Sequence, residues 1–408
     1  MPQIDYGNTA FVLMSAALVL FMVPGLALFY GGLVRSKNVL STIMHSLFAM
    51  GIVSITWVLI GFTIAFGSTD WALGAFIGSL DHIGLAGTLG GVSGTIPTPL
   101  FVAFQGMFAV ITVALISGAF AERMKFSAYA IFIALWSVIV YAPLAHWIWG
   151  GGWLAERGAL DFAGGTVVHI ASAAAALAGA IALGKRKGYG TTALTPHNLP
   201  MTVLGAGMLW FGWFGFNAGS ALAANELAST AFLATHLAAA AGMLGWLTAE
   251  WLKRGKPTTL GAASGAVAGL VGITPAAGFV TPMAGIAIGL IAGALCFFGL
   301  SLKERFGFDD ALDVVGIHGV GGTVGAILTG VFASTVIAPG LVDTFAEVGR
   351  GGLILEQVIG VVATIVFSFG VSFVLLKAID LVIGLRVDEE AEEAGCDLSE
   401  HAESGYVL

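Results

Sequence analysis

Long apolar segments recur along almost the whole chain, separated by short polar breaks. Crossing a bilayer as a helix takes roughly 17 to 25 mainly apolar residues. We place eleven such segments near residues 9–31, 41–66, 99–120, 126–147, 162–184, 198–217, 227–251, 258–275, 282–301, 312–336 and 357–383. In lipid only helices and closed barrels satisfy the backbone, and the alternating pattern typical of barrel strands is missing. We therefore predict an all-α integral membrane protein with eleven transmembrane helices.

The overall composition excludes a soluble fold. Of 408 residues, 58% are hydrophobic and only 10% are charged, and water could not solvate a globular domain with that balance. The net charge of −8 comes largely from the acidic end of the chain, and no basic patch indicates a nucleic-acid partner. Catalytic signatures are also missing, so an enzyme is not expected, and no cofactor is predicted.

The positions of the lysine and arginine residues predict the topology, because short cytoplasmic loops retain positive charge. Residues 1–8 carry no lysine or arginine, so the first apolar segment is expected to be a retained helix and not a signal peptide. Alternate loops carry Arg35, Lys37, Arg123, Lys125, Lys185, Arg186, Lys187, Lys253, Arg254, Lys256, Lys303 and Arg305. Only Arg157 and Arg350 fall in the intervening loops. The predicted orientation is N-terminus outside and C-terminus inside.

Two histidines, His169 and His318, lie inside apolar segments, and each follows an aspartate by eight residues, Asp161 and Asp310. An ionisable side chain at bilayer depth is costly unless it faces a cavity or a partner. In the predicted topology the two segments enter from opposite sides of the membrane. The repeated spacing therefore indicates an inverted repeat, whose halves characteristically meet at a substrate path near the midplane.

The predicted domain organisation follows from this repeat. A membrane domain spans residues 1–383, with two five-helix pseudo-repeats at about 9–184 and 198–336 and a final helix at about 357–383. Residues 384–408 form an acidic cytoplasmic C-terminal tail.

Several stretches, read in order, resemble the Amt/Mep/Rh ammonium transporters, in particular the Amt branch found in bacteria and archaea. They are GLALFYGGLVRSKN (25–38), FVAFQGMFAVITVALISGAFAERMKFSA (101–128), HWIWGGGWL (146–154), DFAGGTVVHI (161–170), HNLPMTVLGAGMLWFGWFGFNAGSALAANE (197–226) and DVVGIHGVGG (313–322). The resemblance extends from about residue 5 to residue 388.

The resemblance implies a homotrimer with one pore through each subunit, and it implies roles for individual residues. An external ammonium recruitment site would consist of Phe104, Phe108, Trp149 and Ser220. Phe108 and Phe216 would form a stacked phenyl gate beneath it. His169, His318 and Trp213 would line the pore, with Asp161 as a buried carboxylate near the outer site.

The chemistry of ammonium supports such a site. Aromatic faces attract ammonium and potassium alike, whereas a hydroxyl acceptor favours the ion that carries N–H donors. A narrow apolar path makes transfer of a whole ion expensive, and ammonium alone can avoid this cost by giving up its proton. We therefore expect deprotonation outside, passage of neutral ammonia past the histidines, and reprotonation inside, with or without separate proton transfer.

Other interpretations remain open at this stage. A mid-membrane histidine could cross-link helices through a backbone carbonyl, and two histidines could bind a metal, although no nearby cysteine or glutamate completes a ligand set. Asp161 could be the N-cap of its helix or a proton relay. The alternative functions are an electroneutral Rh-like gas channel and an ammonium sensor. A potassium channel is disfavoured because no carbonyl filter sequence is present.

The resemblance also predicts partners and location. GLRV (384–387) followed by acidic residues resembles the family's usual tail start, where contact with a cytoplasmic PII signal protein is expected. The alternative is a solvated, partly disordered tail. A multi-pass protein of the cell inner (plasma) membrane is expected.

Overall fold

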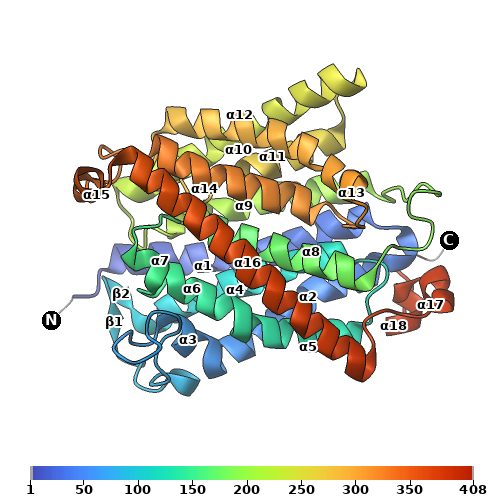
Figure 1. Cartoon of the computed structure of the whole chain (residues 1–408), viewed down its shortest axis with the longest axis horizontal. Coiled ribbons are helices and arrows are strands. Elements are labelled where there is room, and N and C mark those ends of the chain that lie inside the picture. The colour runs from blue at the N-terminus through green and yellow to red at the C-terminus, as the bar shows by residue number, and fades with distance from the viewer. Residues whose placement is uncertain (1–2, 407–408) are drawn as a thin grey trace.

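The computed structural model describes residues 3–406, which form a bundle of long helices running broadly along one direction (Figure 1). The longer helices are α1 (Tyr6–Leu33), α2 (Val39–Thr56), α4 (Thr98–Phe120), α5 (Phe126–Trp136), α8 (Ala171–Leu183), α9 (Leu199–Gly219), α10 (Glu226–Arg254), α11 (Thr259–Ile273), α12 (Pro282–Gly299), α14 (Val320–Phe332) and α16 (Gly349–Ile383). The shorter helices are α3 (Phe62–Phe66), α6 (Ala142–Trp149), α7 (Trp153–Glu156), α13 (Ser301–Phe306), α15 (Leu341–Glu347), α17 (Glu389–Ala394) and α18 (Cys396–His401).

Short 3-10 and π-helical segments complete or connect these helices. They are η1 (Ser36–Asn38), η2 (Trp57–Gly61), η3 (Ile83–Leu85), η4 (Ser137–Tyr141), η5 (Gly165–Ile170) and η6 (Val315–Gly319). Because η2, η4, η5 and η6 continue directly into α3, α6, α8 and α14, each pair acts as one longer helix.

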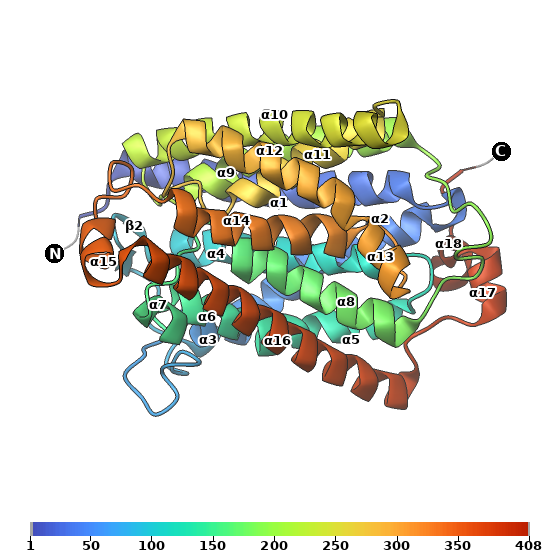
Figure 2. The ribbon, with the colours of Figure 1, turned by 45° about the horizontal axis from the view of Figure 1, so that its top comes forward.

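The two ends of the bundle carry different small elements. At one end lie the start of α1, the helices α7 and α15, and the antiparallel hairpin of β1 (Val92–Ser93) and β2 (Ile96–Pro97) (Figure 2). We call this the hairpin end. The opposite end carries α13, α17 and α18 and is called the tail end.

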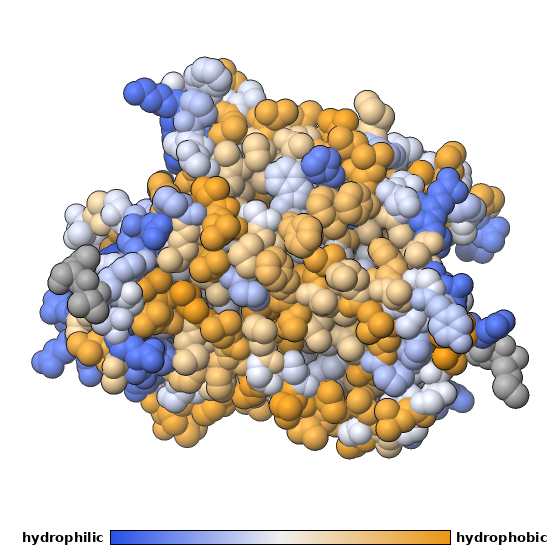
Figure 3. Space-filling view, turned by 180° about the vertical axis from the view of Figure 1, so that it is seen from behind, coloured by the Kyte–Doolittle hydropathy of each residue, from blue (hydrophilic) through white to orange (hydrophobic). Residues whose placement is uncertain are grey.

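The predicted helical membrane fold is confirmed in its main features. Within residues 3–406, ten helices are long and apolar enough to cross a membrane. The eighth predicted segment, 258–275, forms α11, which is apolar but has only 15 residues. At 1.5 Å per residue α11 is about 22 Å long, shorter than the hydrocarbon core of about 30 Å. A broad apolar surface lies between hydrophilic ends (Figure 3), as a bilayer requires.

Glycines let the first helices of the two predicted halves, α1 and α9, pack closely. A Cβ atom at Gly205 of α9 would lie 2.3 Å from the backbone nitrogen of Phe29 on α1, and one at Gly212 would lie 2.3 Å from Cγ of Met22. Any larger residue at either position would push the helices apart. Close backbone approach through small residues is how membrane helices gain packing energy in lipid.

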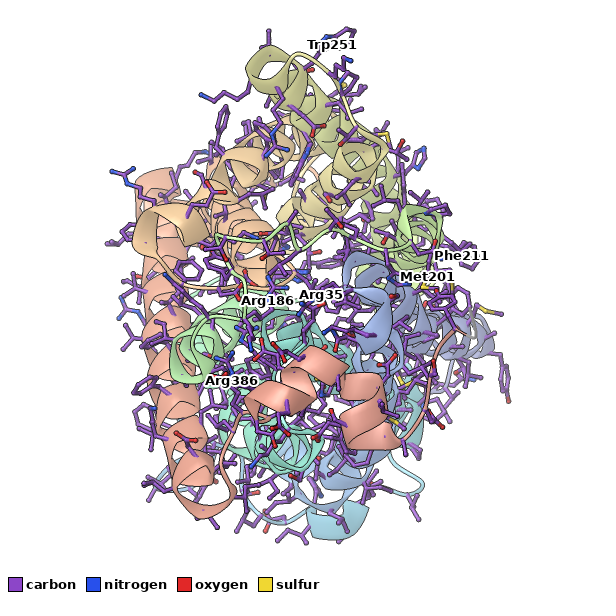
Figure 4. All side chains as sticks on the ribbon, turned by 90° about the vertical axis from the view of Figure 1, so that its right-hand side faces the viewer. Arg35, Arg186, Met201, Phe211, Trp251 and Arg386 are labelled. Carbon is purple, nitrogen blue, oxygen red and sulfur yellow. The ribbon has the colours of Figure 1, made fainter. Side chains whose placement is uncertain are left out.

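A buried ion cluster joins several loops at the tail end. The carboxylate of Glu122 pairs with Arg35 (3.1 Å) and Arg186 (3.0 Å), and Arg186 also pairs with Asp309 (2.9 Å). Burial raises the pKa of Glu122, but the hydrogen bonds and charges of the two arginines outweigh it and hold the pKa below its usual value. The cluster fixes the loops after α1, α4 and α8 relative to one another. Figure 4 shows Arg35 and Arg186 close together beside the tail helices.

The tail is packed against this end, and the part within the described residues is not a solvated chain. The Asp397 carboxylate accepts the Ser41 N–H (2.8 Å), and the Asn38 side chain accepts the Cys396 N–H (2.8 Å). Glu392 pairs with Arg386 at 2.6 Å. The sequence did not indicate these contacts, because an acidic segment of this composition is equally compatible with disorder.

Candidate transport path

Two π-helical turns carry the two histidines. His169 lies in η5 and His318 in η6, and the two turns begin from opposite ends of the bundle. A π-turn holds an extra residue and is found mostly at functional positions. The turn at η5 starts at Gly164, whose φ of 112° lies in a region that favours glycine.

Asp161 anchors the start of η5. Its carboxylate accepts the backbone N–H groups of Gly164 (2.7 Å), Gly165 (2.7 Å), Thr166 (2.8 Å) and Val167 (3.1 Å), and also the Thr166 hydroxyl. These donors are the free N–H groups that a helix start leaves without partners. The N-cap interpretation of Asp161 therefore describes the contacts of its carboxylate, which all lie within its own loop and turn.

The two histidine rings face each other in the middle of the bundle. Their centroids are 5.2 Å apart with an interplanar angle of 25°, and their Nδ1 atoms are 3.2 Å apart. Both residues are buried, at 2% and 5% exposure. His169 Nε2 has no hydrogen-bond partner among residues 3–406, so it stays available to a molecule beside it.

Aromatic rings continue the column from the histidines toward the hairpin end. The rings of Phe108 and Phe216 are stacked, with centroids 4.3 Å apart and an interplanar angle of 30°. Phe216 lies 6.1 Å from His169, and Trp213 lies 5.4 Å from the same ring at an angle of 28°. The stacked rings of Phe108 and Phe216 therefore fill the column next to the histidine pair, on the side of the hairpin end.

Two partly exposed side chains, Trp149 and Ser220, and the buried Phe104 lie on the other side of this stack. Trp149 meets the Phe108 ring edge to face at 5.9 Å, and Phe104 lies 5.0 Å from Phe108. The Ser220 hydroxyl donates to the Phe216 carbonyl at 2.9 Å, which leaves the lone pairs of its oxygen free to accept. The Trp149 indole N–H donates to the Asp161 carbonyl at 2.8 Å, so the loop that starts η5 also orients this ring.

A small apolar cavity of about 10 Å³ is bordered by both histidines and by Phe216. Its walls are Met22, Leu26, Phe29, Ile111, Leu115, Val168, His169, Leu209, Trp213, Phe216, Val267 and His318. A volume near 10 to 15 Å³ measured in this way holds about one water-sized molecule. The column therefore has room for one small neutral molecule next to the imidazoles.

Comparison with known proteins identifies the family. A sequence profile of the Ammonium Transporter Family matches residues 10–406. The chain is 55% identical to an ammonium transporter of Bacillus subtilis over 404 residues, which cover 98% of each chain. The chain belongs to the ammonium transporter family. Among solved structures it is similar to Mep2 of Saccharomyces cerevisiae (TM-score 0.88, 37% identity, 95% of this chain and 89% of that one) and to a sensor Amt protein (TM-score 0.90, 32% identity, 97% and 98%).

The structure of this ammonium transporter family member brings all the sequence-predicted site residues into one column. From the hairpin end inward they are Trp149, Ser220 and Phe104, then Phe108 and Phe216, then Trp213, His169 and His318, with Asp161 behind Trp149. They come from five helical elements, α4, α6, η5, α9 and η6, and from the loop that holds Asp161. Sequence separation alone would not have placed them together.

Sequence reasoning missed Thr274, which holds the pore tryptophan. The Trp213 indole N–H donates to the Thr274 hydroxyl (2.9 Å), which itself donates to the Leu270 carbonyl (2.7 Å). Thr274 directly follows the short helix α11 and is fully buried. Its only sequence signal was a polar residue at the end of an apolar segment.

Asp310 resembles Asp161 in spacing but not in environment. Its carboxylate accepts the Val315 N–H at 2.7 Å, and its Oδ1 atom is buried without a partner in the described part of the chain. Burial and the nearby Asp313 raise the pKa of Asp310 to about 6, although Lys303 opposes the shift. The two aspartates therefore differ in their partners: the Asp161 carboxylate accepts several hydrogen bonds, whereas Asp310 keeps one oxygen without a partner in the described part of the chain.

Proposed function

We propose that this chain is an ammonium transporter that takes up NH4⁺ at the hairpin end, removes a proton and conducts NH3 to the tail end. The observation that carries this proposal is the paired, buried histidines beneath a stacked phenylalanine gate, beside a cavity for one small molecule. Membership of the ammonium transporter family supports the substrate.

Recruitment of the ion is assigned to Phe104, Phe108, Trp149 and Ser220. The aromatic faces attract a cation by about 0.5–2 kcal/mol per contact. The Ser220 hydroxyl hydrogen is already used by the Phe216 carbonyl, so its oxygen accepts from an N–H donor of ammonium. Potassium gains from the rings but has no donor for this oxygen, and the site discriminates on that basis.

The stacked rings of Phe108 and Phe216 are assigned as a gate. Their separation of 4.3 Å is van der Waals contact, so at least one ring must move for a molecule to pass. The apolar cavity beyond them gives an ion nothing to replace its hydration, which costs many kcal/mol. Ammonium avoids this cost by leaving its proton behind, and potassium and sodium have no such option.

The histidine pair is assigned as the site where ammonia forms hydrogen bonds within the apolar path. Two neutral rings that meet through Nδ1 share one hydrogen, so one ring donates and the other accepts. The donor ring then has a bare Nε2 and the acceptor ring has an Nε2–H. The pair therefore offers ammonia one acceptor and one donor while carrying no charge that would repel ammonium.

Asp161 is assigned a positioning role. Its carboxylate is occupied by the η5 backbone and the Thr166 hydroxyl, and its carbonyl orients Trp149. These contacts support an anchor that connects the recruitment site with the histidine turn. A proton relay would have to break several of these hydrogen bonds.

The wider architecture is proposed on the same basis. Eleven membrane crossings, with α11 as the eighth, would place the hairpin end outside the cell and the tail end in the cytoplasm of a multi-pass inner-membrane protein. The predicted boundaries, pseudo-repeats at about 9–184 and 198–336 and a final helix, are kept. A homotrimer is proposed from the resemblance to the Amt branch. Leu204 (60%) and Phe211 (56%) of α9 and Leu244 (60%) of α10 form an exposed apolar surface that either lipid or a second subunit would cover.

The second candidate function is an ammonium sensor that acts through a PII-type partner. It is favoured by the ordered packing of the tail on the loops that surround the ion cluster and by similarity to a sensor Amt protein. An electroneutral gas channel would use the same column, and only the charge carried distinguishes it.

Recording currents from the purified protein in liposomes tests the main proposal. We expect a transient current on an ammonium jump, carried by the released proton as it crosses separately from NH3, and none on a potassium jump. His169→Ala should reduce the ammonium current and admit a potassium current. Ammonia flux detected by internal pH, without any current, would replace the proposal by the gas channel, and no flux of either kind would favour the sensor.

A matched control separates the histidine pair from histidine loss in general. His236 on α10 is exposed on the outside of the bundle, where it packs against Trp210 at 5.6 Å. His236→Ala should leave both the ammonium current and the exclusion of potassium unchanged.

A further inference from the structure

An apolar groove runs along the outside of the bundle between α8, α14 and α16, directly behind the histidine turns. It has a volume of about 300 Å³ and is lined by residues such as Ile170, Leu177, Leu302 and Thr323. We propose that this groove binds one acyl chain of an anionic phospholipid from the leaflet at the tail end. The headgroup would lie against Lys185 and Arg305.

The groove arises from the path of α16. This 35-residue helix crosses the bundle obliquely and departs from α14 toward the tail end (Figures 1 and 2). Ile365, near its middle, still lines the groove. On the opposite walls stand Ala173, Ala174 and Gly319, which are too small to fill the space that α16 leaves.

The length of the groove fits half a bilayer. Ile170 adjoins His169, and Leu302 lies on α13 at the tail end. The wall contributed by α8, from Ile170 to Leu177, covers about 10 Å at 1.5 Å per residue, and the groove continues beyond it to α13. A single leaflet provides about 15 Å of hydrocarbon, so one chain reaches from the tail-end surface to the level of the histidines.

The chemistry of the walls selects the chain over a polar occupant. Thr323 carries the single hydroxyl among the described lining residues, and every other wall position is aliphatic or glycine. A peptide or ion placed there would lose hydration without gaining hydrogen bonds. An acyl chain has no hydration to lose there. It also makes van der Waals contacts with groove walls that would otherwise have no partner atoms.

Two basic residues stand at the open end. Arg305 follows Leu302 by three residues on α13, and therefore shares its face, while Lys185 comes just after the last residues of α8. The Tyr189 hydroxyl donates to the Phe308 carbonyl at 3.1 Å, which ties these two segments together. Both basic side chains are exposed.

These two cations lack acidic partners. Within residues 3–406 neither Lys185 nor Arg305 forms an ion pair; Lys185 lies over the Tyr189 ring at 5.7 Å. Basic pockets between membrane helices on the cytoplasmic side bind anionic headgroups, and the proposal assigns these two cations to such a pocket. Each such residue near an anionic surface strengthens binding by roughly fivefold.

Photo-crosslinking tests the proposal on the whole protein in vesicles. The host vesicles are a mixture of phosphatidylcholine and phosphatidylglycerol. One preparation contains a trace of phosphatidylglycerol with a diazirine near the end of its acyl chain. A parallel preparation contains the same trace of phosphatidylcholine with that diazirine. Peptides are then mapped by mass spectrometry. We expect several-fold more labelling by phosphatidylglycerol than by phosphatidylcholine, concentrated on residues 170–177 and 315–324. Equal labelling by the two lipids, or no labelling of these residues, would refute the site.

Variants identify the parts of the site. In the double variant Lys185→Glu with Arg305→Glu, the ratio of phosphatidylglycerol labelling to phosphatidylcholine labelling should fall by at least about fivefold. Lys253→Glu with Lys256→Glu makes the same charge change on two exposed cations, one in the last turn of α10 and one just after it, and should keep the excess. Thr323→Phe should block the groove and reduce labelling by both lipids there. An excess that survives in the first variant, or peptide cross-links to a second copy of the chain at this groove, would overturn the proposal.

Discussion

The Nδ1 atoms of His169 and His318 lie 3.2 Å apart, although 149 residues separate the two positions in sequence. The hydrogen shared between them makes the donor or acceptor state of one ring depend on the other. The two imidazoles therefore act as one unit.

This coupling predicts non-additive variants. His169→Ala and His318→Ala should each reduce the ammonium current strongly, and the double variant should reduce it little further, because either single change already breaks the unit. Currents from proteoliposomes of equal protein content measure this. If the double variant shows the product of the two single effects, the rings work independently.

Thr274 should matter for the pore through Trp213. Thr274→Val removes the acceptor of a buried indole N–H, which costs about 1–3 kcal/mol, so the melting temperature in detergent should fall. Trp213 would also lose its fixed orientation beside His169, and the ammonium current should fall with it. Thr274→Ser keeps the hydroxyl and should restore both values; a melting temperature that is unchanged in the valine variant would contradict the role.

Glu122 should be among the most sensitive charged residues at the tail end. Glu122→Gln leaves Arg186 with one partner fewer at a site where both side chains are nearly buried, at 1% and 7% exposure. Breaking a buried pair costs about 3–5 kcal/mol, and thermal unfolding in detergent should show it. The control is Glu356→Gln, which breaks the more exposed pair with Arg157 and should cost about 0–1 kcal/mol.

The raised pKa of Asp310 predicts that the stability of the fold depends on pH. Its pKa of about 6 lies above the ordinary 3.8, so the fold favours the protonated carboxyl. This contribution is fully present below pH 3.8 and is lost as the pH rises through about 6, by up to about 3 kcal/mol. Asp310→Asn should therefore melt near the wild-type temperature at pH 4 and above it at pH 7. The same difference at both pH values would show that Asp310 is not the cause.

The tail contacts can be tested by proteolysis. Asp397→Ala removes the acceptor of the Ser41 N–H and should release α18, so cleavage within residues 389–401 should become several-fold faster. Glu403→Ala changes an exposed tail carboxylate and should leave the rate unchanged. Equal cleavage of Asp397→Ala and wild type would mean that this hydrogen bond does not hold the tail.

The sequence predicted the helical segments well because membrane insertion imposes one dominant signal, a run of apolar residues. It also named the ring and histidine residues of the column, but through the family motifs, since Phe108 and Phe216 are indistinguishable from lipid-facing aromatics by composition. Their assigned roles remain predictions until the variants are measured.

Other features left no readable signal. The π-turns at His169 and His318 each hold one more residue than an α-helical turn. The periodicity of apolar residues in the sequence does not show where that extra residue lies. Thr274 depends on the end of an unusually short helix. The docking of Asp397 on Ser41 joins positions 356 residues apart, and nothing local in an acidic segment specifies that partner.

The small size of the cavity beside the histidines has a consequence for the cell. A space for about one molecule cannot hold a continuous file of water, so it provides neither an osmotic leak nor a water wire along which protons could hop. Any proton that crosses this segment must be handed on by the imidazole rings themselves. In the proposed function, protons would therefore cross only by way of the imidazole rings, and a membrane densely populated with this protein would have no continuous proton leak.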